Sequence, residues 1–117
     1  MKFNYIYDEQ SDVLSIFNNS SKPKESIGFS ENIIFDINNE GHLVAIQILE
    51  ASEFFNSINN LINKDFLINL EGVELTEKEY RNNWFVVIGF KSKGLTLVQQ
   101  PMPLLRKAEY KSPLMYA

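Results

Sequence analysis

The sequence contains no cysteine and has a single histidine, His42. Without cysteine there are no disulfide bonds, no thiolate metal ligands and no cysteine nucleophile, as is typical of a reducing compartment. A lone histidine cannot build a histidine-rich metal site, and as a general base it would need an orienting carboxylate and a nucleophile. Because His42 follows the turn residue Gly41, we interpret it as a surface histidine. We expect no enzyme activity, no catalytic residue, no cofactor and no bound metal.

Long apolar stretches are missing as well, since the longest run is about five residues, at 84–88. A membrane-spanning helix needs roughly 20 apolar residues, and the first eight residues lack the apolar core of a signal peptide. The net charge of −4 disfavours general nucleic-acid binding, because phosphate neutralisation requires clustered Lys and Arg. We expect a cytoplasmic protein without a membrane, nucleic-acid or small-molecule ligand.

Two acidic patterns in the sequence are candidates for cation-binding sites. Asp36, Asn38 and Glu40 alternate before Gly41, as at the start of an EF-hand loop, but the twelfth position is Gln47 and not the bidentate Glu that such a loop requires. The neighbouring residues have strand character, so the pattern predicts a hairpin turn.

A second acidic group comprises Asp8, Glu9 and Asp12. Paired carboxylates can bind a cation or perform acid–base chemistry. Acidic residues between two strands of a β-protein are more commonly solvated turn formers, and this is the interpretation that we favour.

The charge is unevenly distributed along the chain. Residues 1–90 carry 14 acidic and 6 basic side chains, whereas residues 91–117 carry 5 basic side chains and one acidic side chain. A basic tail can cover an acidic body, within one subunit or between subunits. It can also dock on an acidic partner or on RNA.

The first half has the two-residue period of β-strands. Phe3, Tyr5 and Tyr7 place three aromatic rings on one face of the first strand. Polar turns separate the later segments, as in an antiparallel meander. The predicted strands are residues 3–7, 13–17, 25–29, 32–37 and 42–49.

The period then changes to that of a helix at residues 51–64, where Phe54, Phe55, Ile58, Leu61 and Ile62 form one apolar stripe. Further strands are predicted at 66–70, 84–90 and 95–99, the second of them central and covered because both of its faces are apolar. Residues 76–79 resemble a capping box, which leaves a helical turn and a strand as equal alternatives there. The fold class is therefore α+β, mainly antiparallel β, with one amphipathic helix.

The first half also resembles a known family. The pattern consists of Tyr7-Asp8, Asp12, Leu14 and Ile16, then a strand ending in Asp36, a turn at Gly41, and Ile46, Ile48, Leu49, Ala51 and Ser52. These spacings resemble the prokaryotic family Domain of Unknown Function 2283 over residues 3–53, with Ala45 in place of the usual Gly and Gln47 in place of the usual Glu. The resemblance implies a small antiparallel sheet followed by a helix. It implies no established activity, although some relatives are encoded beside small toxins.

After residue 100 the regular pattern stops. We expect a single α+β domain at 1–100, with the family-like meander at 3–53 and a second set of strands at 66–100, followed by an extended proline-containing tail at 101–117. The tail is basic and unusually apolar, as suits groove binding or strand addition. We therefore predict a non-catalytic protein-interaction module, self-associating as a homodimer or serving a larger assembly; the alternative is an antitoxin-like or nucleic-acid-associated regulator. The candidate partner-binding residues are Leu104, Leu105, Arg106, Lys107, Tyr110, Leu114, Met115 and Tyr116.

Overall fold

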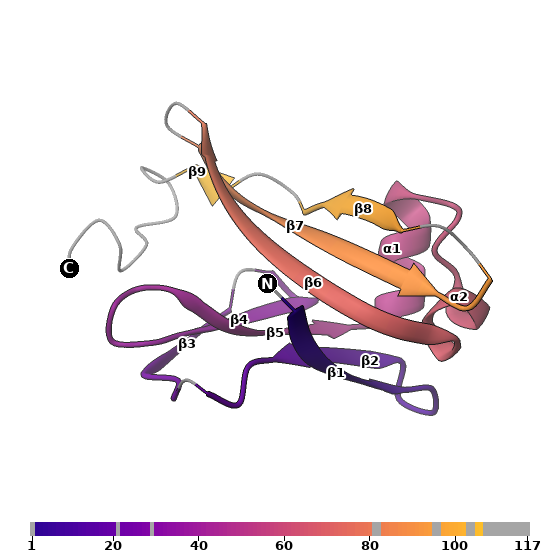
Figure 1. Ribbon diagram of the computed structural model, residues 1–117, viewed down its shortest axis with the longest axis horizontal. Coiled ribbons are helices and arrows are strands. Elements are labelled where there is room, and N and C mark those ends of the chain that lie inside the picture. Colours follow the sequence, from indigo (N-terminus) through magenta and orange to yellow (C-terminus); the bar gives the residue numbers. More distant parts are fainter. Residues whose placement is uncertain are drawn as a thin grey trace.

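The computed structural model describes residues 2–20, 22–28, 30–80, 83–94, 97–102 and 105–106. Within these ranges the chain forms a strand-rich fold with two short helices (Figure 1). In chain order the elements are β1 (Lys2–Asp8), β2 (Val13–Phe17), β3 (Glu25–Gly28), β4 (Ile33–Ile37), β5 (Leu43–Leu49), α1 (Ala51–Ile58), α2 (Lys64–Ile68), β6 (Leu70–Tyr80), β7 (Asn83–Ser92), β8 (Val98–Pro101) and β9 (Leu105–Arg106).

Strand β1 joins the two halves of one antiparallel sheet. The strand order is β3-β4-β5-β2-β1-β6-β7-β8, and β9 pairs with β7 outside this path. β1 pairs with β2 from Asn4 to Asp8, but it pairs with β6 only through Lys2 and Phe3. Beyond this short contact the β6–β7 hairpin crosses over the first five strands, so the two halves of the sheet face each other (Figure 1).

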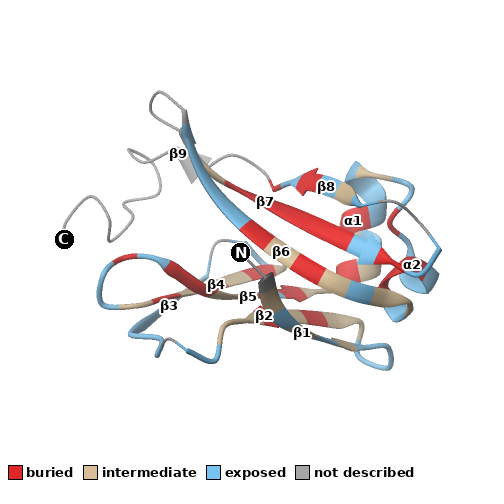
Figure 2. Ribbon diagram, viewed as in Figure 1, coloured by how far each residue is buried: buried red, intermediate tan, exposed pale blue. Residues whose placement is uncertain are grey.

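The core lies between these two halves (Figure 2). Alternate residues of each strand point inward. β2 buries Leu14 and Ile16, and β6 buries Val73 and Leu75. β4 and β5 add further inward residues, and β7, which is buried from Val86 to Phe90, contributes Val86, Ile88 and Phe90 to the same interior.

Both helices pack against β7 at one end of this interior. Phe55 of α1 is fully buried, and its ring meets Phe90 of β7 edge to face with the centroids 5.2 Å apart. Phe66 of α2 meets the same Phe90 ring at 5.9 Å. Edge-to-face contacts of this kind are the favoured geometry for aromatic pairs.

The α+β class with mainly antiparallel strands is confirmed, but the single helix predicted at 51–64 is wrong in number and extent. α1 ends at Ile58, because Asn59 is extended. The Asn63 side chain then accepts a hydrogen bond from the Phe66 N–H at 2.8 Å and begins α2. The strand predicted at 66–70 is therefore wrong as well, since this cap directs the chain into a helical turn that buries Phe66 and Leu67.

Most of the other predicted strands are confirmed. All five strands of the first half are present. The predicted meander is wrong, however, because β2 pairs with β1 and β5 and not with β3, which lies at the edge beside β4. Residues 76–79 are strand, because they pair in register with β7, and residues 84–90 lie in β7 between β6 and β8. The strand predicted at 95–99 begins at Val98, and residues 95 and 96 lie outside the described part. No described helix has the length and apolarity to cross a membrane.

Candidate functional site

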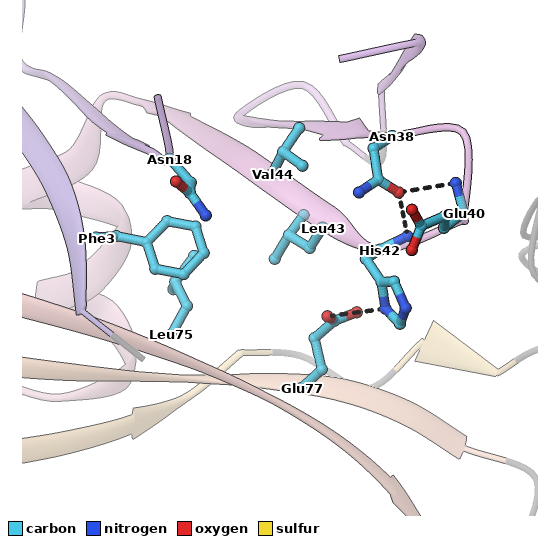
Figure 3. A pocket seen from close by; sticks show the side chains of 9 residues that line it. All are labelled: Phe3, Asn18, Asn38, Glu40, His42, Leu43, Val44, Leu75 and Glu77. Atoms are coloured by element: carbon cyan, nitrogen blue, oxygen red, sulfur yellow. Dashed lines mark hydrogen bonds and ion pairs between the residues drawn. The ribbon is translucent and has the colours of Figure 1, made fainter. Parts of the chain in front are cut away.

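A cleft of about 430 Å³ opens between the two halves of the sheet (Figure 3). It lies at the β4–β5 hairpin, away from the end of the interior that α1 fills (Figure 1). The lining comes from β1, β5, β6 and the turns beside them. The lining residues are Phe3, Asn18, Asn38, Glu40, His42, Leu43, Val44, Leu75 and Glu77.

A β-bulge shapes the apolar floor of the cleft. Asp36 pairs with Ala45, whereas the next residue, Ile37, pairs with Leu43, so that Val44 is the extra residue of β5. Neighbours on a regular strand point to opposite faces, and at this bulge both Leu43 and Val44 are buried. Figure 3 shows the two side chains on opposite sides of β5, with Leu43 on the side of Phe3 and Leu75, so these three residues from β5, β1 and β6 form the apolar floor.

The rim is polar and is held in place by the β4–β5 turn. The Asn38 side-chain oxygen accepts hydrogen bonds from the N–H groups of Glu40 and His42, each at 3.0 Å. Gly41 completes the turn at φ 81°, a conformation that favours glycine. This turn is the hairpin that the sequence predicts, and it presents Glu40 and the exposed His42 at the mouth of the cleft.

One contact spans the mouth. Nδ1 of His42 lies 3.9 Å from Oε2 of Glu77, which reaches across from β6 (Figure 3). Glu77 belongs to the inward series of β6, where Val73 and Leu75 are buried and Glu77 and Glu79 are exposed. The inner face of β6 therefore changes from apolar to acidic as the strand passes the mouth of the cleft.

The acidic turn residue Asp12 belongs to a different constellation. It has a left-handed backbone conformation, with φ 56°, and its carbonyl accepts a hydrogen bond from the N–H of Ala51 at 2.9 Å. The carboxylate accepts hydrogen bonds from the Ser52 N–H at 3.0 Å, the Ser52 hydroxyl at 2.7 Å and the Tyr7 hydroxyl at 2.5 Å. Asp12 thus connects the β1–β2 turn to the first turn of α1, where a negative charge is favoured.

These hydrogen bonds, together with burial, shift the pKa values of the Asp12 carboxyl and the Tyr7 hydroxyl. Burial raises the pKa of the Asp12 carboxyl, but the hydrogen bonds from Tyr7 and Ser52 outweigh burial and hold the pKa below its ordinary value. Burial and the adjacent Asp12 carboxylate raise the pKa of the Tyr7 hydroxyl well above its ordinary value. Asp12 is therefore ionised and Tyr7 neutral at pH 7, and their chemistry is that of a structural clamp.

Asp8 is satisfied within its own turn. Hydrogen bonds from the side chain and N–H of Ser11 and from the N–H of Gln10 lower the pKa of the Asp8 carboxyl. The interpretation as a solvated turn residue agrees with the geometry of Asp8, whereas Asp12 is half-buried and bonds to Ser52 and Tyr7. Among the residues that the structure describes, no group of three or more His, Asp or Glu side chains is placed to hold a metal ion.

The comparison with protein families finds a match in the first half of the fold. The family model described as "Protein of unknown function (DUF2283)" matches residues 4–52. The resemblance seen in the sequence is thereby confirmed over this segment, which contains most of β1, all of β2 to β5 and the complete Tyr7–Asp12–Ser52 clamp. No curated protein and no solved structure matches the chain.

The predicted partner-binding residues are only partly described. Leu105 and Arg106 form β9, and they pair with Trp84 and Asn83 at the start of β7. The others, Leu104, Lys107, Tyr110, Leu114, Met115 and Tyr116, lie outside the described residues.

The sequence did not predict the cleft, because its lining comes from distant segments that only the curled sheet brings together. One signal was present in β6. Two acidic residues, Glu77 and Glu79, continue the inward alternation of Val73 and Leu75.

Proposed function

We propose that this chain is a non-catalytic protein-interaction module, self-associating or acting as a small subunit of a larger assembly, and that the cleft is its docking surface. One observation carries the proposal: an apolar floor stands open between the sheet halves beneath an acidic rim. Such a site fits an extended segment with apolar and basic side chains. The apolar side chains supply binding energy by leaving water, and the rim charges steer and orient the segment.

Groove binding suits this fold better than strand addition. Of the two outer strands in the order, β3 has only four residues and follows Lys22, Pro23 and Lys24, while β8 ends at Pro101. Short edges flanked by Lys and Pro are common devices against pairing with another chain. The cleft, in contrast, has the size of pockets that receive a few side chains.

The test compares capture of partners from native lysate by the full chain and by a cleft variant, Glu40→Lys with Glu77→Lys. The control is Glu9→Lys with Glu31→Lys, which makes the same charge change at exposed positions that do not line the cleft. Circular dichroism first establishes that all three proteins are folded, and sedimentation measures their self-association.

We expect the wild type and the control to form a stoichiometric complex, with a partner or with a second copy, that survives nuclease and is lost in the cleft variant. A complex that the cleft variant retains would contradict the cleft as the docking surface. Capture that nuclease abolishes would contradict the proposal in favour of a nucleic-acid-associated regulator. Absence of any partner and of any self-association in the wild type would overturn it altogether.

A further inference from the structure

We infer that residues 107–117 of the same chain are an occupant of the cleft, so that any other partner has to displace them. The inference rests on the proposed docking function of the cleft. It identifies a segment of the same chain as the ligand of the cleft. It also implies that this segment competes with any other partner and thereby regulates binding.

The chain leaves its described part beside the cleft. Arg106 pairs with Asn83 at the start of β7, and Asn83 pairs with Tyr80 at the end of β6. Glu77, at the rim, lies three residues before Tyr80 on the same strand. Two strand spacings of about 4.8 Å and three residues of about 3.3 Å separate Arg106 from Glu77, or about 14 Å in all.

Eleven residues span this distance with length to spare. An extended chain covers about 3.3 Å per residue, so residues 107–117 reach about 36 Å. About five residues bring the chain to Glu77, and the remaining six can lie along the cleft. A tethered segment of this kind has an effective concentration in the millimolar range, which favours it over a free competitor of equal affinity.

The chemistry of the segment complements that of the cleft. Lys111, the fifth residue after Arg106, can reach the rim carboxylates of Glu40 and Glu77, and Lys107 adds positive charge on the approach to them, in a chain whose residues 1–90 are strongly acidic. Leu114, Met115 and Tyr116 match the apolar floor formed by Phe3, Leu43 and Leu75. Basic residues thus come first along the segment and apolar residues last, so the charged part passes the rim before the apolar part reaches the floor.

Two other surfaces fit the segment less well. Ile58, Leu61 and Ile68 are exposed near the helices. They lie toward the opposite end of β7 from Arg106, since Ser92 contacts α2; ten residues of strand, about 33 Å, consume nearly the whole reach. A shallow hollow on the outer face, beside Gln47, has Asp36 as its carboxylate, and Asp36 already accepts a hydrogen bond from Ser26.

The absence of cysteine permits a direct test by disulfide trapping in the full chain. One protein carries Glu40→Cys with Leu114→Cys, which pairs the rim with the segment. The matched control carries Gln47→Cys with Leu114→Cys, which pairs the exposed outer face of the neighbouring strand with the same segment. Both are oxidised in dilute solution, and intrachain and interchain disulfides are separated by non-reducing electrophoresis and mass spectrometry.

We expect the rim pair to form an intrachain disulfide at least about tenfold faster than the outer-face pair, in line with the gain from a favourably placed tether. Adding Lys107→Glu and Lys111→Glu should slow the rim pair. Equal rates for the two pairs would overturn the inference, and so would interchain disulfides alone, which would place the segment in a second copy. If trapping fails while capture from lysate still requires Glu40 and Glu77, only this inference fails; if trapping succeeds while nothing is captured, only the proposed function fails.

Discussion

The Asp12 carboxylate binds the backbone N–H and the hydroxyl of Ser52, which lies 40 residues further along the chain. Glu50, the residue that precedes α1, makes no side-chain capping bond. Asp12 therefore supplies from the β1–β2 turn what a local cap ordinarily supplies. Both Asp12 and Ser52 lie within the segment that matches the family model.

Two substitutions at Asp12 should distinguish how much its side-chain hydrogen bonds and its left-handed backbone conformation each contribute to stability. Asp12→Ala removes every side-chain acceptor and also forces alanine into a left-handed conformation, so we expect a loss of about 2 kcal/mol in the free energy of unfolding. Asp12→Asn keeps an acceptor and tolerates that conformation, and should lose about 1 kcal/mol or less. Urea unfolding at pH 7 measures both. Equal losses would show that the amide cannot replace the carboxylate as an acceptor, and would contradict this explanation.

The clamp predicts a loss of stability in acid. Because the folded-state pKa of Asp12 lies below its ordinary value of 3.8, the unfolded state takes up a proton first as the pH falls. The stabilisation is complete above the ordinary pKa and disappears as the pH falls through the folded-state value. Unfolding free energies between pH 7 and 2 should therefore fall less steeply for Asp12→Asn than for the wild type. Parallel curves of unfolding free energy against pH for the two proteins would mean that Asp12 contributes nothing to the loss of stability in acid.

The raised pKa of Tyr7 predicts a loss of stability in alkali. Its raised pKa means that the unfolded state loses the phenolic proton first, so stability should decline as the pH rises above the ordinary value of 10.0. Tyr7→Phe should remove this contribution and cost about 1 kcal/mol at pH 7 through the lost hydrogen bond. The control Tyr5→Phe, which removes the hydroxyl bonded to the Leu70 carbonyl, should leave the contribution of Tyr7 in place. Unfolding between pH 8 and 11 distinguishes the two variants.

Two residues of α1 should differ sharply in their importance for the core. Phe55 is fully buried against Phe90, whereas Ile58, three residues later, is 45% exposed. Phe55→Ala should cost about 3–5 kcal/mol, and Ile58→Ala should change stability by about 0.5 kcal/mol or less. Comparable losses from the two substitutions, measured by chemical unfolding, would contradict the packing described for α1.

Residue patterns could predict the strands of this fold because alternation is a local signal. Phe3, Tyr5 and Tyr7 alternate on β1, and the turn at Gly41 marks the β4–β5 hairpin. The helix α2 escaped prediction because five residues show no period, and its one signal was the capping residue Asn63. The capping-box pattern at residues 76–79 was overridden by pairing with β7, which is a tertiary effect.

The candidate site was harder to predict than the fold. Phe3, Leu43 and Leu75 come together only because the sheet curls at β1, and the pairing of Leu43 with Ile37 depends on a bulge. The Tyr7–Asp12–Ser52 clamp likewise joins residues from two distant segments. The predicted partner-binding residues belong to the tail, most of which lies outside the described residues, and their role remains a prediction.

The most direct test of whether the cleft receives this segment is a comparison of amide NMR spectra. It compares the full chain with a full-chain variant that carries Leu114→Ser, Met115→Ser and Tyr116→Ser. If the segment occupies the cleft, the largest shift changes among the body residues will fall on those that line it, such as His42, Leu43, Leu75 and Glu77. The outer-face amides of Ser15 and Gln47 will stay unchanged. Unchanged cleft amides, or changes centred on the outer face or the helices, would contradict the cleft as the place where this chain receives a basic and apolar segment.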